Sequence, residues 1–225
     1  MVVVAAGRGT RVGGDLPKQF LPIAGVPVLL RAVRPFASHP DVAQVVVVLA
    51  PADVESPPEF LASLTGEALA VAAGGRERSD SVAAGLRVLR ADCEIVLVHD
   101  GARPFVDRAV IDAVIARARA GEGAVAAVPV SDTLKEAAAV DPTLVARTVP
   151  RGRLWRAQTP QGFPRRLLEE AYERAGTAAS EATDEASLVE ACGGVVRLVP
   201  DSPRNMKITT RDDLAVAEVL AGAQR

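Results

Sequence analysis

The chain is poor in the residues that form disulfides, metal clusters and membrane spans. It has two cysteines and two histidines among 225 residues. Cys93 and Cys192 form no C-x-x-C pair, which favours buried reduced thiols, and His39 and His99 belong to no metal-ligand cluster. No run approaches the roughly 18 apolar residues that cross a bilayer, and no basic segment leads into an apolar stretch at the N-terminus. We therefore expect a cytoplasmic protein with no membrane partner.

A strong net charge and the common nucleotide motifs are also missing. The formal charge is −2, so the chain as a whole does not attract nucleic acid, and no nucleic-acid partner is expected. A dinucleotide fingerprint needs a third glycine at position 12, where Val12 stands. The Gly-Lys-Ser/Thr string of a Walker loop occurs nowhere. Any phosphate site must therefore be local and of another kind.

Aromatic residues make up only 3% of the chain, and its apolar residues are mostly Ala, Val and Leu. This composition suits valine-rich strands covered by alanine-rich helices. Strand-like and helix-like segments alternate, which predicts one α/β domain over residues 1–225 with a mostly parallel sheet. The expected strands are 2–4, 44–50, 68–73, 95–98, 124–130 and 195–199, and the expected helices are 27–37, 79–90, 109–120, 165–175, 185–191 and 211–223.

Residues 132–150 interrupt this alternation. Two β-like pieces, 133–137 and 144–149, flank the turn signal Asp141-Pro142. The segment has too few apolar residues to be a core element. It is predicted to be a β-arm subregion that projects from the sheet and finds its partner on another subunit.

The first strand leads directly into a loop suited to phosphate. Gly7 and Gly9 let the backbone turn sharply and approach a ligand closely, while Arg11 brings forked donors and Lys18 a second cation. The alternative is an ordinary strand-to-loop turn whose arginines are solvated.

Two more clusters follow strands. In residues 74–81, glycines precede a helix N-terminus that offers free N–H groups to an anion; the alternative is a solvated charge run on a helix capped by Ser79 or Asp80. Asp100 follows an apolar strand and can hold Mg²⁺ through one carboxylate, with Arg103 tying the loop or binding substrate. A capping Asp beside a surface Arg is the alternative interpretation.

The last clusters lie in the arm and near the C-terminus. Thr133 and Arg151 carry groups that recognise a phosphomonoester. The alternative interpretation of these residues, and of residues 158–163, is a turn-forming composition. Lys207 stands between Met and Ile, which places it in less solvated surroundings than a typical surface lysine, although surface snorkelling is the alternative.

Seven strings carry a family resemblance in this order: AAGRGTR with the following PKQ, GGRERSDS, HDGARPF, SDTLK, TPQGF, TDEAS and NMKIT. Together they resemble the 2-C-methyl-D-erythritol 4-phosphate cytidylyltransferases of the non-mevalonate isoprenoid pathway, over essentially the whole chain. The resemblance implies a Rossmann-like nucleotidyltransferase fold, with helices on both faces of a mostly parallel twisted sheet, and a homodimer formed through the β-arm.

The implied reaction transfers CMP from CTP to methylerythritol phosphate with Mg²⁺, by in-line attack of the substrate phosphate on the α-phosphorus. The products are 4-diphosphocytidyl-2-C-methyl-D-erythritol and pyrophosphate. Such chemistry consists mainly of positioning and charge neutralisation and needs no protein nucleophile.

The resemblance also implies a role for individual residues. The catalytic roles fall on Arg11, Lys18, Arg151 and Lys207. The nucleotide-binding roles fall on Ala5, Ala6, Gly7, Gly9, Gly75, Ser81 and Asp100. The substrate-binding roles fall on Asp100, Gly101, Arg103, Thr133, Arg151 and Lys207. Asp100 is the metal-ligand candidate; otherwise Mg²⁺ is held by the CTP phosphates and water.

Three positions depart from the family pattern, and other functions stay open. Val4 stands where the family often has proline, Arg76 where some relatives have Asp, and Pro150 where Asp is frequent. The alternative acceptor is D-ribitol 5-phosphate, although the small Gly101 and Ala102 favour methylerythritol phosphate. A nucleotidyltransferase with another base preference is a more distant alternative. A non-catalytic nucleotide-binding module is an alternative of another class.

Overall fold

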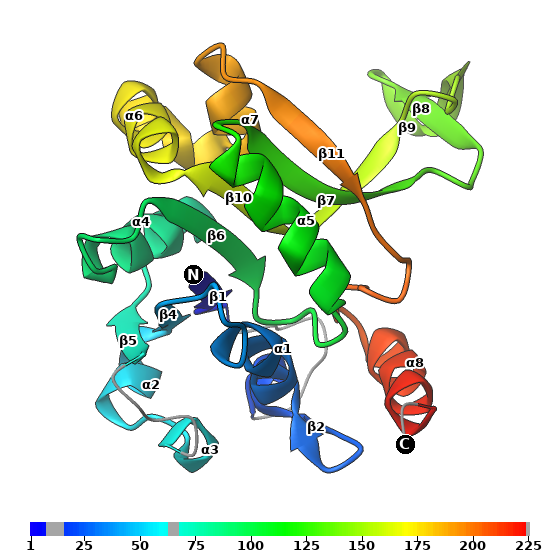
Figure 1. The fold of residues 1–225 in the computed structure, drawn as a ribbon. Helices are drawn as coiled ribbons and strands as arrows, with labels where there is room; N and C mark the ends of the chain where they lie inside the picture. Colours follow the sequence, from blue (N-terminus) through cyan, green and yellow to red (C-terminus); the bar gives the residue numbers. More distant parts are fainter. Residues whose placement is uncertain (8–15, 63–67, 224–225) are drawn as a thin grey trace.

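A seven-stranded sheet forms the centre of the computed structural model, which describes residues 1–7, 16–62 and 68–223 (Figure 1). The strand order is β11-β7-β10-β6-β1-β4-β5. These strands are β1 (Val2–Ala5), β4 (Val45–Leu49), β5 (Leu69–Ala73), β6 (Ile95–Asp100), β7 (Gly123–Pro129), β10 (Trp155–Pro164) and β11 (Val196–Pro200). Only β10 pairs antiparallel with its neighbours in this sheet. The sheet is therefore mostly parallel, as expected.

Helices cover both faces of the sheet because alternate strand residues point to opposite faces. Val3 and Val47 pack with α1 and α5 on one face, whereas Val2 and Val46 pack with α4, α6 and α7 on the other. The helices are α1 (Val28–Ala37), α2 (Pro51–Glu55), α3 (Glu59–Ala62), α4 (Arg78–Val88), α5 (Arg108–Arg119), α6 (Arg165–Ala175), α7 (Glu185–Ala191) and α8 (Arg211–Gly222). The 3-10 helices are η1 (Lys18–Phe20) and η2 (Gly176–Glu181), and β2 (Pro22–Ile23) pairs with β3 (Val26–Pro27). No helix in the described part of the chain has the length and apolar character needed to cross a membrane.

The strands and helices expected from the sequence are present, each with ends within two residues of the expected ones. One prediction is wrong: residues 158–163 are not a turn but the buried middle of β10. The register of β10 against β7 shifts between Ala157 and Gln161, and such an irregularity accommodates a proline within a sheet. The polar composition of residues 158–163 did not predict a buried strand. Such a strand is possible here because residues far away in the sequence form hydrogen bonds with its polar groups.

Two local predictions also need correction. The N-cap of α4 is Glu77, not Ser79 or Asp80; Asp80 lies three residues later and its carboxylate accepts the Glu77 N–H at 3.0 Å. This arrangement is a capping box. The turn of the hairpin lies at residues 139–140, and Asp141 begins the second strand.

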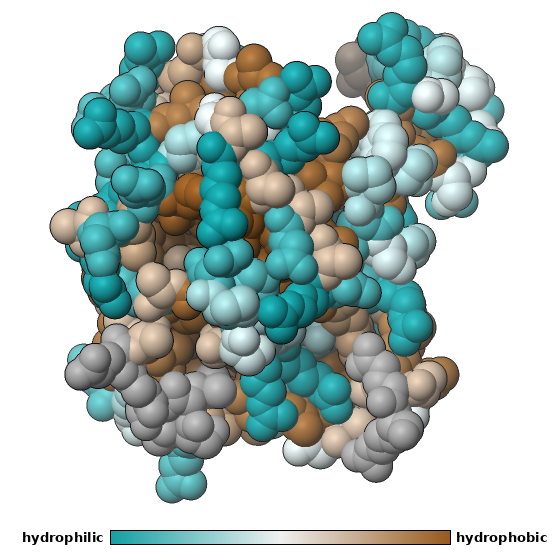
Figure 2. All heavy atoms as spheres, viewed as in Figure 1, coloured by the Kyte–Doolittle hydropathy of each residue, from teal (hydrophilic) through white to brown (hydrophobic). Residues whose placement is uncertain are grey.

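The hairpin consists of β8 (Leu134–Ala138) and β9 (Asp141–Val149), which pair antiparallel. It stands apart from the seven-stranded sheet at the upper right of Figure 1, and the face seen in Figure 2 is mostly hydrophilic or neutral. Val140, Leu144 and Val145 on this hairpin are nevertheless 91%, 58% and 54% exposed. These apolar side chains have no cover within the described chain.

His99 links β6 to β10 from a fully buried position. Its Nε2 lies 3.0 Å from the Arg103 carbonyl oxygen, which only accepts, so Nε2 carries the hydrogen. Its Nδ1 therefore accepts from the Thr159 hydroxyl at 2.9 Å, and that hydroxyl oxygen accepts the Asp100 N–H at 3.0 Å. When the imidazole of His99 is neutral, each polar group in this chain of hydrogen bonds has a partner. Burial lowers the pKa of His99 from its ordinary 6.5 to about 4.

This neutral histidine predicts a loss of stability in mild acid. The unfolded chain takes up a proton on His99 near its ordinary pKa of 6.5, whereas the folded protein does so only near pH 4. The stability that His99 contributes is therefore present above pH 6.5 and is lost as the pH falls toward 4. Between pH 7.5 and pH 5 the loss in unfolding free energy is about 2 kcal/mol. Urea unfolding of the wild type and of His99→Gln at both pH values measures it. The loss in unfolding free energy between the two pH values should be about 2 kcal/mol smaller in His99→Gln than in the wild type. Equal losses in the two proteins would contradict a neutral His99 in the folded state.

Candidate active site

A cavity of about 230 Å³ opens at the carboxyl ends of β1 and β6, where parallel sheets commonly bind ligands. Its walls come from the end of β1, η1, the start of α4, the segment after β6, and Lys207. The sequence-predicted residues that line it are Ala5, Ala6, Gly7, Lys18, Ser81, Asp100, Gly101 and Lys207. Gly9 and Arg11 lie outside the described residues. Arg76, which departs from the family pattern, lines the cavity with a 95% exposed side chain.

Close backbone packing shapes this cavity. A Cβ on Gly74 would lie 2.5 Å from Cβ of Ala6 and 2.7 Å from Oγ of Ser81. A Cβ on Gly75 would lie 2.3 Å from Cβ of Asp80. Gly74 therefore lets the 74–81 segment approach the residue after β1, and Gly75 lets that segment fold closely against the start of α4. Gly75 itself supports the wall through this packing.

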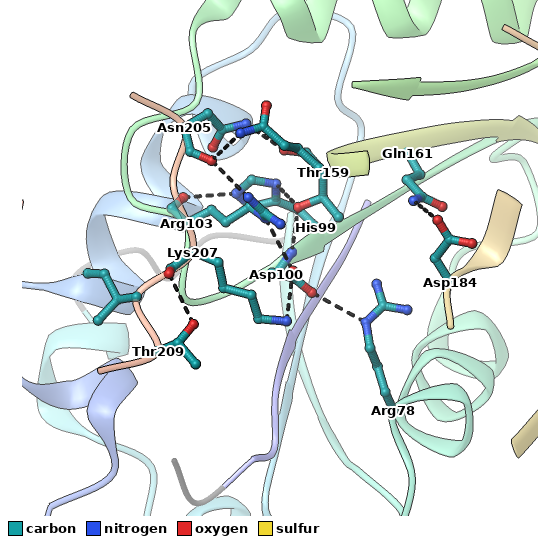
Figure 3. A network of polar contacts seen from close by, with 12 residues as sticks. Arg78, His99, Asp100, Arg103, Thr159, Gln161, Asp184, Asn205, Lys207 and Thr209 are labelled. Atoms are coloured by element: carbon teal, nitrogen blue, oxygen red, sulfur yellow. Dashed lines mark hydrogen bonds and ion pairs between the residues drawn. The ribbon is translucent and has the colours of Figure 1, made fainter. Parts of the chain in front are cut away.

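Asp100 is the electrostatic centre of the site (Figure 3). Its carboxylate lies 3.1 Å from Nζ of Lys207 and 3.3 Å from Nε of both Arg78 and Arg103. Burial alone would raise the pKa of the Asp100 carboxyl, but these cations hold that pKa well below its ordinary range. Three cations around one carboxylate leave a net positive charge, which suits a ligand that carries phosphate.

The two predicted catalytic lysines are positioned from opposite ends of the chain. Nζ of Lys18, on η1, donates to the Ile208 carbonyl at 2.7 Å. Lys207 precedes this residue and reaches Asp100. Nε2 of Gln19 donates to the Ala5 carbonyl at 2.7 Å and ties η1 to β1. The segment after β11 is thus connected to the first loop of the chain.

Arg103 ties the loop together, in agreement with one of its two predicted roles. Its Nη1 donates to the Asn205 carbonyl at 2.8 Å, while its Nε faces Asp100. The Asn205 amide in turn donates to the Thr159 carbonyl at 2.8 Å. These bonds connect β6, β10 and the segment that carries Lys207.

A second cavity of about 260 Å³ lies on the other side of Asp100. Arg78, Asp100 and Lys207 line both cavities and form their shared wall. The remaining lining of the second cavity is largely polar and consists of Arg103, Ala157, Gln158, Thr159, Gln161, Thr183 and Asp184. The site therefore has two compartments that meet at one charged wall.

Arg78 and Glu185 are functional candidates that sequence reasoning missed. Both lie in strings that carry the family resemblance, but neither received a role. Nη1 of Arg78 lies 2.7 and 2.9 Å from the two Glu185 carboxylate oxygens. Their place in these strings was a signal, but nothing in the sequence paired the two residues.

The predicted arm residues do not line either cavity. Thr133 is exposed just before β8, and Arg151 is exposed after β9, where its Nη1 donates to the Ser131 carbonyl. Among the described residues that form the two cavities, none belongs to the hairpin. Within one chain, the structure does not bring Thr133 and Arg151 to Asp100.

Comparisons with known proteins agree with this architecture. A family model described as 2-C-methyl-D-erythritol 4-phosphate cytidylyltransferase (IspD) matches residues 1–222. A bifunctional enzyme IspD/IspF of Rhodospirillum rubrum is 46% identical over 97% of this chain, and the match covers 56% of that relative. A 2-C-methyl-D-erythritol 4-phosphate cytidylyltransferase of Alkaliphilus oremlandii is 37% identical, over 100% of this chain and 95% of the relative.

A solved structure extends the likeness to three dimensions. The crystal structure of 2-C-methyl-D-erythritol 4-phosphate cytidylyltransferase from Thermus thermophilus has a TM-score of 0.81 and 36% identity, covering 99% of this chain and 98% of that chain. The chain spans about half the length of the bifunctional relatives that it matches. Because the family model runs from β1 to α8 and includes both cavities, the chain belongs to the 2-C-methyl-D-erythritol 4-phosphate cytidylyltransferase family.

Proposed function

We propose that this protein transfers CMP from CTP to 2-C-methyl-D-erythritol 4-phosphate and releases pyrophosphate. The observation that carries the proposal is the pair of cavities that share Arg78, Asp100 and Lys207. A transfer between two phosphorylated substrates needs two binding compartments that meet where the phosphates react. Family membership supplies the identities of the two substrates. The expected cytoplasmic location belongs to the same proposal.

CTP occupies the first cavity in this proposal. The base and ribose lie along the backbone of Ala5, Ala6 and Gly7 and near Ser81, where close packing leaves room for a small pyrimidine. The triphosphate extends toward Lys18. Arg11, outside the described residues, is proposed to bind phosphate oxygens from the preceding loop.

The acceptor occupies the second cavity. Its hydroxyls face the polar side chains of Thr159 and Asp184, and its phosphate lies at the shared wall with Lys207. Gly101 and Arg103 shape and tie the loop beside it. This placement directs an acceptor phosphate oxygen toward the α-phosphorus of CTP.

The chemistry consists of positioning and neutralisation of charge. An acceptor phosphate oxygen forms a bond to the α-phosphorus while the bond from that phosphorus to the pyrophosphate oxygen breaks. The attacking oxygen is already anionic, so the protein need not remove a proton. Lys18 and Lys207 stabilise the negative charge on the reacting phosphates. Asp100 keeps the cations of the shared wall in place.

Mg²⁺ belongs to the proposal as an ion that arrives with CTP. Among the described residues, no group of three His, Cys, Asp or Glu side chains is placed to hold a metal ion. The Asp100 carboxylate faces both cavities but already pairs with three cations. This lining fits a Mg²⁺ bound mainly by phosphate oxygens and water, with Asp100 as the carboxylate that faces both cavities. Bound in this way, the ion would neutralise charge on the departing pyrophosphate.

We further propose a homodimer in which the hairpin of one chain completes the site of the other. The exposed apolar residues of the hairpin need a cover, and a symmetric partner supplies one. Thr133 and Arg151 do not line the cavities of their own chain, yet they carry the hydroxyl and guanidinium expected around an acceptor phosphate.

The first prediction from this mechanism concerns Lys18. Pyrophosphate release should require CTP, Mg²⁺ and methylerythritol phosphate, and Lys18→Ala should lower kcat on the order of 10²- to 10³-fold because a charged donor is lost. Arg87→Ala, on the exposed side of α4, is the control and should retain wild-type activity. Ribitol 5-phosphate is assayed in parallel. A preference for it would assign the protein to the sister activity, and a fully active Lys18→Ala would refute the role of this lysine.

The second prediction tests sharing of the site between subunits. Lys18→Ala and Arg151→Ala should each be inactive, but unfolding and refolding them together as a mixture should restore activity. Random assortment makes half of the dimers mixed, and each mixed dimer has one intact site of two, so about a quarter of wild-type activity should return. Light scattering checks that a dimer forms. No recovery in mixed dimers would show that Arg151 acts within its own chain, and an Arg151→Ala protein that is active by itself would show that Arg151 has no role.

A further inference from the structure

Arg78 makes an unusual set of contacts at the wall between the two cavities. Figure 3 shows one of them, with Asp100. Its guanidinium is positioned by two buried carboxylates from different elements, Asp100 on β6 and Glu185 on α7. Nε donates to Asp100 at 3.3 Å, and Nη1 donates to both oxygens of Glu185 at 2.7 and 2.9 Å. The side chain is 29% exposed, so one part of it still faces the cavities.

The donors of Arg78 are not all used by these contacts. A guanidinium has five N–H groups, one on Nε and two on each terminal nitrogen. Asp100 takes the Nε hydrogen and Glu185 takes those of Nη1. The two hydrogens of Nη2 have no partner among the described residues. They are a fixed pair of donors at a wall that serves two phosphorylated substrates.

Glu185 itself does not line either cavity. Its residue is 1% exposed, and its other side-chain contact is the Tyr172 hydroxyl at 3.3 Å. Burial raises the pKa of the Glu185 carboxyl, and the charge of Arg78 opposes that rise. A buried carboxylate with one cationic partner adds little net stability, because its desolvation offsets the attraction. The main effect of the Glu185 carboxylate is therefore on the position of Arg78, to which it is bound through both oxygens.

We propose that Glu185 is a positioning residue for cytidylyl transfer. By holding Nη1 of Arg78, Glu185 keeps the arginine from turning its fork onto Asp100 and leaves the Nη2 donors for a phosphate oxygen at the shared wall. A flexible arginine loses rotamer entropy when it is fixed, and Glu185 fixes Arg78 before the substrates bind. This inference rests on the proposed function, since it names the group that orients one of its phosphate ligands.

Glu185→Gln is the test, because it preserves shape but replaces one acceptor oxygen by an NH₂ group that opposes the arginine donors. We expect kcat to fall about 10- to 100-fold, the range seen when a supporting partner of a reacting group is lost. The matched control is Glu190→Gln, the same change at an exposed position of α7, with kcat at the wild-type level. Tyr172→Phe removes the hydroxyl from Glu185 but leaves Arg78 bound, and it should also keep kcat within about twofold.

A double-mutant cycle distinguishes a positioning role of Glu185 from a purely structural link between α4 and α7. Arg78→Met should lower kcat, and adding Glu185→Gln to it should cause no further loss. If the losses in kcat of the two single variants multiply in the double variant, the proposal is overturned. It is also overturned if Glu185→Gln has a lower melting temperature but wild-type kcat per folded molecule. If Glu185→Gln does not fold, Arg78→Lys decides. It keeps the charge beside Glu185 but removes the fork, so its kcat should also fall at least tenfold, and an unchanged kcat would overturn the proposal.

CTP binding distinguishes failure of this inference from failure of the proposed function. A wild-type protein that binds CTP but releases no pyrophosphate with methylerythritol phosphate contradicts the function. Calorimetry with CTP then tests the role of Glu185 directly, because Arg78 lines the nucleotide cavity. We expect about tenfold weaker CTP binding by Glu185→Gln and by Arg78→Met, with no additivity between them. An unchanged Kd in Glu185→Gln would overturn the inference in that case.

Discussion

The charge cluster around Asp100 is the interaction on which the site depends. One buried carboxylate brings together cations from α4, from the loop after β6 and from the segment after β11. Removing the Asp100 carboxylate from this cluster would leave its cations without their shared counter-charge. The same cluster forms the wall between the two cavities, so the residues that stabilise the local fold also define where two phosphates meet.

The position of this wall depends on the antiparallel strand β10. Thr159 on β10 binds the Asp100 backbone and the His99 ring, and its carbonyl receives the Asn205 amide. These bonds tie β6 to the segment that carries Lys207. A parallel sheet alone offers loops at its carboxyl edge; the reversed strand adds a polar surface that completes the second cavity. The polar residues of β10 are thus explained by the site, not by the requirements of a strand.

The arrangement suits chemistry in which the protein orients charges and the substrates supply the reacting groups. The cavities provide cations on both sides of the proposed reacting centre, and Arg78 contributes donors to the wall from a position set by Glu185. The hairpin adds exposed apolar side chains, Val140 above all, that the described residues of a single chain leave without cover. In the proposed dimer, each site would be complete only after two chains assemble through this hairpin.

The sequence by itself determined the valine-rich strands, the amphipathic helices, the strand ends near which Gly7 and Asp100 stand, and the place of Lys207 after the last strand. Those features follow from local periodicity and from residue types with strong conformational preferences. The family strings likewise identified the family from sequence alone. Only the tertiary structure decided that residues 158–163 form a strand, that His99 is neutral, and that Arg78 is held by Glu185. The partners in each case lie far apart along the chain, with a separation of 107 positions between Arg78 and Glu185, so their pairing and desolvation exist only after folding.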